Sequence, residues 1–212
     1  MKGFFITGTD TGVGKTFVTC AFARQATSRG KKVFAFKPIE TGCPMVDGRL
    51  FGSDQELLAQ AAGNWQRGSH RGVYRFSQAV APLVAATAES EVIDLEWIAD
   101  VFKKGSSEAD LVLVEGAGGW RVPITETVDM GGLAKRVGLP VIVVARAGLG
   151  TINHSLLTIE AVEKEGLTLH AVVLNPLPTD EPGLAASNAD EIRRQWSSGT
   201  VLVGTDLGAL GT

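Results

Sequence analysis

Residues 8–16, with the sequence GTDTGVGKT, combine glycines, a lysine and a hydroxyl at a spacing that could bind phosphate. They follow an apolar run and open a helical pattern, and in that context successive backbone N–H groups can point at phosphate oxygens. Lys15 would then reach the β- and γ-phosphates of a nucleotide, and the Thr16 hydroxyl would bind Mg²⁺. The strict phosphate-loop pattern has glycine where Thr9 stands, and Gly8 is the nearest substitute. An ordinary strand-to-helix turn is the alternative, but the flanking elements favour phosphate binding.

Further charged residues come at the ends of apolar runs. Glu115 follows residues 111–114, so its carboxylate is expected at the ligand edge of an open α/β sheet, where it could complete a metal site. A carboxylate at a strand end can also simply cap the following turn. Lys37 leaves another apolar run and is either a surface residue or an anion ligand. Asp54 opens a helical pattern, and taken alone it is best explained as a helix N-cap.

Alternating strands and helices must position these residues. We predict strands at residues 3–7, 33–37, 110–115, 141–145, 169–175 and 201–203. We predict helices at residues 14–28, 54–62, 94–104, 129–137, 151–165 and 189–196, and a surface loop at residues 177–187. Asp94 is the expected N-cap of its helix, and Gly105 and Gly138 are expected helix stops. The strands are near-continuous apolar runs, which is typical of strands buried on both faces.

The repeated strand–helix unit indicates the fold class. We expect an α/β fold of the phosphate-loop NTPase type, a doubly wound and mainly parallel sheet with helices on both faces. No low-complexity linker interrupts the sequence, so a single domain over residues 1–212 is expected.

The composition excludes several classes of protein. Of the 212 residues, 44% are hydrophobic and 20% are charged, as in globular proteins and unlike disordered chains. The 20 Lys and Arg residues against 23 Asp and Glu residues give a net charge of −3, so neither nucleic acid nor an anionic membrane is an expected partner. Cys20 and Cys43 make no disulfide framework, and no stretch has the pattern of a signal peptide or membrane span. We therefore expect a cytoplasmic protein.

Together the motifs resemble one known family. They are Gly8-Thr9-Asp10-Thr11-x-Val13-Gly14-Lys15-Thr16, Lys37-Pro38-x-x-Thr41-Gly42, Asp54, Glu115-Gly116-Ala117-Gly118-Gly119 and Gly150-Thr151-Ile152-Asn153-His154. In order and spacing they are similar to those of the dethiobiotin synthetases, over most of the chain and as far as Asn175. The phosphate loop of that family has the same irregular glycine spacing.

The resemblance implies a homodimeric enzyme of biotin synthesis that uses ATP and Mg²⁺ to convert diaminopelargonic acid to dethiobiotin. One amine captures CO₂, supplied from bicarbonate, as a carbamate. The carbamate attacks the γ-phosphate, and the second amine closes the cyclic urea, so that ADP and phosphate are released. By the resemblance, the catalytic residues Lys37 and Lys15 flank the carbamate and the transferring phosphoryl group, two anions whose repulsion fixed cations can offset.

The same resemblance assigns the remaining site residues. The Mg²⁺ ligands would be Thr16, Asp54 and Glu115. The nucleotide-binding residues would be Gly12, Val13, Gly14, Lys15, Thr16, Phe17, Asp54, Glu115, Gly116, Ala117, Gly118, Asn175 and Pro176. The substrate-binding residues would be Thr11, Lys37, Thr41, Gly150, Thr151, Ile152 and Asn153. Residues 150–153 would reach from the partner subunit to the substrate carboxylate, and a helix simply capped by Thr151 is the alternative for that segment.

The chain departs from the family pattern at two places. Many members have glutamate where Gly12 stands, and residues 203–207 lack the Glu-Ile-Pro run that helps to form the base pocket, so the preferred nucleotide base stays open. Two other functions remain as alternatives. A partitioning-type ATPase shares the predicted sheet but carries a signature lysine at the position of Asp10, and a small-metabolite kinase would release a phosphorylated product and need an arginine-bearing lid that we do not find.

Overall fold

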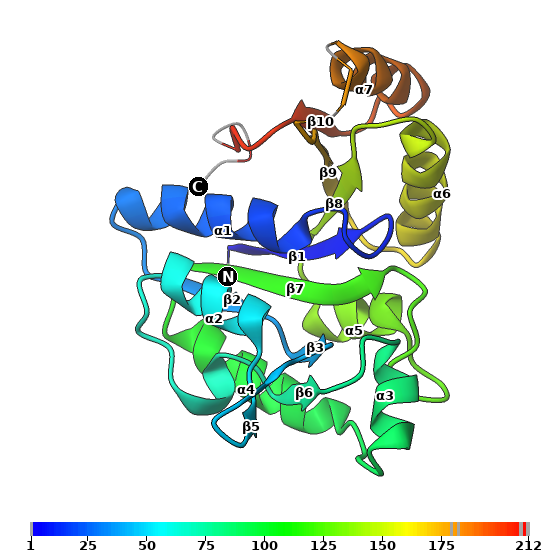
Figure 1. Cartoon of the computed structure of the whole chain (residues 1–212). Coiled ribbons are helices and arrows are strands. Elements are labelled where there is room, and N and C mark those ends of the chain that lie inside the picture. The colour runs from blue at the N-terminus through cyan, green and yellow to red at the C-terminus, as the bar shows by residue number, and fades with distance from the viewer. Residues whose placement is uncertain (1, 179, 182, 208–209, 211–212) are drawn as a thin grey trace.

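A sheet of six parallel strands forms the centre of the computed structural model, which describes residues 2–178, 180–181, 183–207 and 210 (Figure 1). The strands are β1 (Gly3–Gly8), β2 (Val33–Phe36), β7 (Leu111–Gly119), β8 (Val141–Arg146), β9 (Leu169–Asn175) and β10 (Thr200–Val203). They lie in the order β10-β9-β8-β1-β7-β2, and all neighbouring pairs are parallel. The predicted doubly wound α/β sheet is confirmed.

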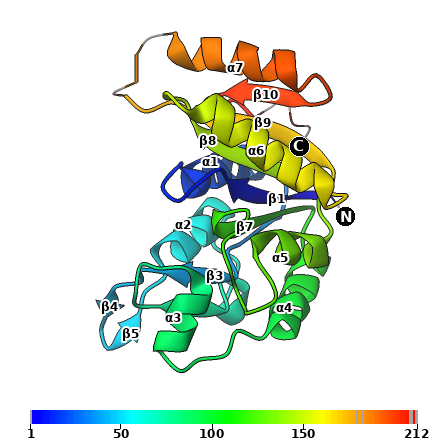
Figure 2. The same ribbon diagram turned by 90° about the vertical axis from the view of Figure 1, so that its right-hand side faces the viewer.

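Helices cover both faces of this sheet, as predicted. One face carries α1 (Lys15–Ser28) and α2 (Ser53–Ala61). The other carries α4 (Leu95–Ser107), α5 (Met130–Val137), α6 (Thr151–Lys164) and α7 (Leu184–Gln195). Figure 2 shows α1 and α2 on one side of the strands and α4 and α5 on the other.

Alternate residues of each strand pack in two apolar clusters, one on each face of the sheet. In β1, Phe5 packs in one apolar cluster, while Phe4 and Ile6 pack in the other. In β7, Val112 and Val114 likewise face away from their neighbours in sequence. Because both faces are buried, most positions in these strands are apolar, which explains the continuous apolar runs.

The strand order places a ligand site at the carboxyl end of β1. After β1 the chain crosses to β2 on one side, and after β7 it crosses to β8 on the other side of β1. Such a switch point opens a crevice at the carboxyl ends of the strands, where ligands bind in open α/β sheets.

Smaller elements lie beyond the β2 edge, and the sequence analysis predicted none of them. They are β3 (Ile39–Thr41) paired in parallel with β6 (Tyr74–Phe76), the hairpin of β4 (Met45–Val46) and β5 (Arg49–Leu50), the single turn η1 (Gly68–His70) and helix α3 (Pro82–Ala88). Each is too short to show a strand or helix period in the sequence.

Several predicted boundaries were wrong. Helix α7 begins at Leu184, inside the predicted loop, and follows Gly183, whose φ of 83° places it in the left-handed region. Helix α4 passes through Gly105 and ends at Ser107, so Gly105 is not the helix stop that was predicted. The glycine instead allows α4 to pack closely on the Phe34 ring, because an added Cβ would lie 2.3 Å from a ring carbon. The predicted cap Asp94 is confirmed, since its side chain accepts two backbone N–H bonds at the start of α4.

Two boundaries bear on the site. Asp54 is not the N-cap of α2, because Gly52 occupies that position and Asp54 lies in the first turn. Strand β7 does not end at Glu115 but continues to Gly119, where it still pairs with Gly8 after a register shift. A bulge in the ladder allows this continued pairing, so Glu115 is held inside a strand.

Candidate functional site

The loop between β1 and α1 presents the start of α1 to a cavity. Gly12 and Gly14 have φ angles of 74° and 94°, a conformation that favours glycine. Gly14 is the N-cap of α1 and supplies no side-chain cap, so the first N–H groups of the helix remain available for an anion. Asn175, at the end of β9, supports the loop by donating an Nδ2 hydrogen bond to the Val13 carbonyl over 3.1 Å.

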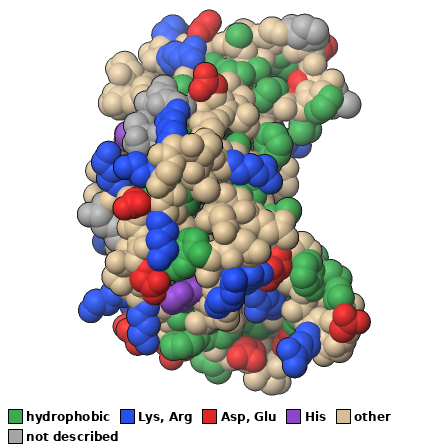
Figure 3. Space-filling view, turned by 90° about the vertical axis from the view of Figure 1, so that its left-hand side faces the viewer, with side chains coloured by type: hydrophobic (Ala, Val, Ile, Leu, Met, Phe, Trp, Pro, Cys, Tyr) green, Lys and Arg blue, Asp and Glu red, His purple; other side chains and the backbone are tan. Residues whose placement is uncertain are grey.

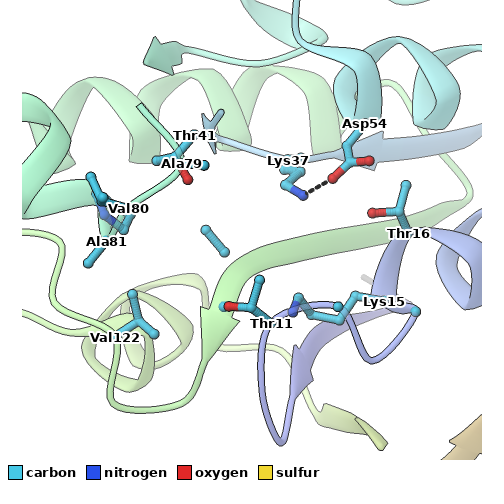
Figure 4. A pocket seen from close by; sticks show the side chains of 15 residues that line it. Thr11, Lys15, Thr16, Lys37, Thr41, Asp54, Ala79, Val80, Ala81 and Val122 are labelled. Atoms are coloured by element: carbon cyan, nitrogen blue, oxygen red, sulfur yellow. Dashed lines mark hydrogen bonds and ion pairs between the residues drawn. The ribbon is translucent and has the colours of Figure 1, made fainter. Parts of the chain in front are cut away.

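The cavity has a volume of about 560 Å³ and lies between this loop and the ends of β2 and β7 (Figure 4). Its lining residues are Thr11, Gly12, Gly14, Lys15, Thr16, Lys37, Thr41, Asp54, Ala79, Val80, Ala81, Pro82, Ala117, Gly118 and Val122. The structure therefore brings half of the residues expected to bind nucleotide, metal and substrate into the lining of one cavity.

A cluster of charged side chains lies at one wall of the cavity, where Lys37 and Asp54 are lining residues and the buried Glu115 contacts Lys37. The Lys37 Nζ contacts Asp54 and donates to Glu115 Oε1 over 3.0 Å. The same Glu115 oxygen accepts the Thr16 hydroxyl over 2.7 Å. Glu115 is fully buried, and its Oε2 has no hydrogen-bond partner among the residues that the structure describes. Figure 4 shows Lys37, Asp54 and Thr16 pointing toward one another.

The two buried lysines have pKa values shifted in opposite directions. Burial lowers the pKa of Lys15 from 10.5 to about 8, although Glu115 opposes the shift, and its Nζ donates to the Asp10 carbonyl over 3.0 Å. Burial also disfavours charged Lys37, but its ion pairs with Glu115 and Asp54 outweigh burial and raise its pKa above the usual range. Lys37 is therefore charged at neutral pH, whereas the protonation of Lys15 is sensitive to the charges of neighbouring groups.

Some predicted site residues lie outside the cavity lining. Val13 and Gly116 are buried behind it, Phe17 is exposed on α1, and Pro176 is exposed after β9. Residues 150–153 open α6, and of these Thr151 borders a separate small pocket together with Thr9 and Asp10. Gly150 is the N-cap of α6, so Thr151 does not cap this helix.

The apolar wall of the cavity was not predicted. It consists of residues 79–82, before and at the start of α3, and Val122, after β7. In Figure 4, Val80, Ala81 and Val122 lie across the cavity from Lys37 and Asp54. Small apolar residues in loops have no characteristic spacing, so no pattern in the sequence could have identified them.

On the face seen in Figure 3, acidic and basic side chains are interspersed. Within the described residues, no helix combines the length and the apolar character needed to cross a bilayer.

Comparison with known proteins assigns the family. A family model described as an AAA domain matches residues 2–204. The ATP-dependent dethiobiotin synthetase BioD of Anaeromyxobacter dehalogenans strain 2CP-C is 43% identical over 195 residues, which cover 92% of this chain and 85% of that protein. The protein of the same name from Aromatoleum aromaticum is 38% identical over 197 residues, covering 92% of this chain and 86% of its own.

Solved structures share the fold at low sequence identity. A chain of the MinC:MinD cell division protein complex of Aquifex aeolicus matches with a TM-score of 0.58 and 15% identity, covering 99% of this chain and 85% of that one. The signal recognition particle receptor FtsY of Elizabethkingia anophelis also has a TM-score of 0.58 and 15% identity, over 96% of this chain and 58% of its own. This fold serves proteins of several functions. Sequence likeness to the dethiobiotin synthetases, by contrast, runs through 92% of the chain, and the chain therefore belongs to that ATP-dependent family.

Proposed function

We propose that this chain catalyses the ATP-dependent carboxylation and ring closure of diaminopelargonic acid to dethiobiotin, with the cavity beside the β1–α1 loop as its active site. The observation that carries the proposal is a pair of buried lysines that line one cavity from different elements, Lys15 at the start of α1 and Lys37 directly after β2. The reaction must bring two anions, a carbamate and a triphosphate, within bonding distance. Fixed cations between them offset that repulsion.

The two lysines have different tasks in this proposal. Lys37, held by Glu115 and Asp54, is charged throughout and orients the carbamate oxygen toward the γ-phosphorus. Lys15 lies at the start of α1, where backbone N–H groups can hold the phosphates. Its ammonium would stabilise the negative charge that develops on the phosphate oxygens during transfer. The carbamate oxygen bonds to phosphorus as ADP leaves, and the second amine then attacks the carbamate carbon as phosphate leaves. Lysine suits both positions because it is a compact charge with three donors.

The residues present fit a Mg²⁺ ion. Thr16, Asp54 and Glu115 offer hard oxygen donors in one connected network, and Glu115 Oε2 is buried without a partner among the described residues. No group of three His, Cys, Asp or Glu side chains in the described part of the chain could hold a metal alone. Mg²⁺ commonly takes one or two carboxylates together with nucleotide phosphates, so this smaller set fits. Bound there, Mg²⁺ would neutralise phosphate charge.

The apolar wall suits the hydrocarbon part of the substrate. Val80, Ala81 and Val122 lie across the cavity from the charged cluster, and Thr11 and Thr41 add hydroxyls between the two. A diamine on an alkyl chain would then place its nitrogens near the lysines and its methylene groups on the apolar side. Burial of methylene groups favours this orientation by about 0.8 kcal/mol for each group.

We also propose a homodimer in which α6 meets the partner subunit. Leu149, just before α6, is 98% exposed, and Leu157 on α6 is 57% exposed. Leu157 borders a groove that Trp120 and Ala161 also line. A second copy on this apolar face would bring residues 150–153 to the neighbouring cavity and its substrate carboxylate. The N–H groups at the start of α6 are suited to a carboxylate.

The nucleotide base is assigned to the region of Asn175 and Pro176. Asn175 donates one amide hydrogen to the Val13 carbonyl, so its side-chain oxygen and its second amide hydrogen can still bond to a base. Residues 203–207, which lack the Glu-Ile-Pro run of the family, lie within the described part of the chain, and adenine preference is not assigned.

A cytoplasmic setting is proposed as well. Cys20 and Cys43 are free and buried, and neither pairs in a disulfide. A cytoplasm that keeps thiols reduced is the usual place for such a chain.

The test is phosphate release from ATP and Mg²⁺ in bicarbonate buffer, with and without diaminopelargonic acid. Release that needs both the diamine and bicarbonate, with dethiobiotin formed in equal amount, is the expected result. Release that is indifferent to both would instead indicate an ATPase that acts on a protein partner.

A further inference from the structure

The first turn of α2, which carries Asp54, is capped by a residue from another element. The N-cap of α2, Gly52, has no side chain to accept the first N–H groups of the helix. Glu40 in β3 supplies the acceptors instead. Its Oε1 accepts the Asp54 N–H over 3.0 Å, and its Oε2 accepts the Gln55 N–H over 2.9 Å. Because Glu40 is only 6% exposed, water does not replace these bonds.

Gln55 extends this contact to the end of β2. Its side chain is fully buried, and its Nε2 donates to the Lys37 carbonyl over 3.0 Å and to the Tyr74 carbonyl over 3.1 Å. The backbone packs tightly around the amide, since a Cβ added at Gly72 would lie 2.0 Å from Gln55 Cδ. We call Glu40 and Gln55 the α2 clamp.

The α2 clamp holds the backbone of both residues in the central ion pair. Glu40 holds the N–H of Asp54, and Gln55 holds the carbonyl of Lys37. Neither clamp residue is among those that line the cavity. We propose that Glu40 is a positioning residue of the active site, which fixes Asp54 at the distance from Glu115 and Thr16 that a divalent cation requires. This inference rests on the proposed function, because it assigns Asp54 to the metal.

A purely structural role for Glu40 makes a different prediction, and the chain offers a matched control. Asp94 Oδ1 accepts the N–H groups of Glu96 and Trp97 over 2.9 and 3.2 Å at the start of α4. It therefore caps a helix with the same chemistry, but α4 carries none of the proposed metal ligands. Losing either cap should destabilise the fold, whereas only Glu40 should affect the metal.

The experiment compares Glu40→Gln with Asp94→Asn in the full chain. The glutamine has one acceptor oxygen, and its NH₂ group faces an N–H that needs an acceptor, so the first turn of α2 loses part of its anchor. Mn²⁺ binding is measured by electron paramagnetic resonance with a non-hydrolysable ATP analogue present, and stability is measured by urea unfolding. We expect Mn²⁺ affinity to fall by about 10-fold or more in Glu40→Gln, as for other residues that orient metal ligands, and to stay at the wild-type level in Asp94→Asn.

Each outcome decides the inference. Wild-type Mn²⁺ affinity in a folded Glu40→Gln protein would show that Glu40 only caps the helix. If Glu40→Gln does not fold, Glu40→Asp decides, because the shorter side chain keeps both acceptor oxygens but draws them back from α2, and wild-type affinity there would likewise overturn the inference. Failure of the proposed function is separate, since it would appear as a wild-type protein without diamine-dependent phosphate release.

Discussion

The low pKa of Lys15 makes the stability of the unliganded protein depend on pH in a specific direction. The pKa falls from 10.5 in the unfolded chain to about 8 in the fold, so between these pH values the unfolded chain binds more protons than the folded one. The free energy of unfolding must then rise with pH across that interval, by about 1.4 kcal/mol per pH unit at most, and by about 3 kcal/mol in total. Below pH 8 the term is constant, because both states are charged.

The substitution Lys15→Met isolates the contribution of Lys15 titration to the free energy of unfolding. Methionine keeps the length and the apolar body of the side chain and removes the charge. Urea unfolding of both proteins, without nucleotide, at several pH values from 8 to 10.5 should show wild type gaining stability relative to the variant as pH rises. Other groups cancel in the difference, including Cys20 and Cys43, whose burial raises their pKa values from 9.0 to about 11 and so lowers stability in the same interval.

Lys37 does not disturb the comparison. Its pKa is raised in the fold, so its contribution is complete below the ordinary value of 10.5 and is lost only as pH rises through the folded value. Parallel stability curves for wild type and Lys15→Met would refute the reasoning, because they would mean that Lys15 has an ordinary pKa in the fold. As an independent check, binding of an ATP analogue at pH values above 8 should take up a proton as the phosphates restore the charge of Lys15, measured by calorimetry in buffers of different ionisation enthalpy.

Three further substitutions test other parts of the site. Lys37→Ala should lower the rate of diamine-dependent phosphate release by about 10²- to 10³-fold, as when other preorganised donors are removed. ATP-analogue affinity should stay close to wild type, and normal turnover would exclude Lys37 from catalysis. Gly14→Ala should abolish binding of the analogue, because its Cβ would meet the Asn175 amide at 2.1 Å. The control Gly138→Ala, also at positive φ but with open space around it, should lose only stability, and equal analogue affinity in the two variants would contradict the tight packing. Leu157→Glu should convert the proposed dimer to monomers in sedimentation velocity, and an unchanged sedimentation coefficient would contradict an interface at α6.

Much of the central sheet was predictable because burial on both faces leaves a clear mark on the sequence. The strand at residues 169–175 was predicted to the residue, since a largely apolar run begins at Leu169 and Asn175 is followed by a proline, which cannot donate to a strand ladder. The start of α7 was not, because the prolines before Gly183 suggested a longer loop, while the sequence of residues 184–188 can form a helix as easily as a turn. Elements of two or three residues, such as β3 and β6, depend on tertiary pairing and have no signal of their own.

The phosphate loop of the site was predictable, but the residues that hold its other side chains in place were not. The residues of the phosphate loop are contiguous, so spacing alone brings them together. Asp54 was explained by capping when taken alone, and only the family resemblance made it a metal ligand. Glu40, which in fact accepts the N–H groups at the start of α2, lies 14 residues before Asp54, at a separation that no helix-capping pattern includes. Contacts across such a separation become visible only when the sheet order is known.

The charges of the site balance before any ligand enters, and this balance explains how a polar cluster can sit at the centre of the fold. Two lysines, Lys15 and Lys37, face two carboxylates, Asp54 and Glu115, and three of the four side chains are nearly or fully buried. A single buried charge without a partner would cost several kcal/mol or shift its pKa until it became neutral. Lys37 avoids this because it contacts both carboxylates. Among the described residues, the Lys15 ammonium donates only to the Asp10 carbonyl, and burial lowers its pKa. The lysine without an ion-pair partner is thus the one best placed to respond when a triphosphate arrives.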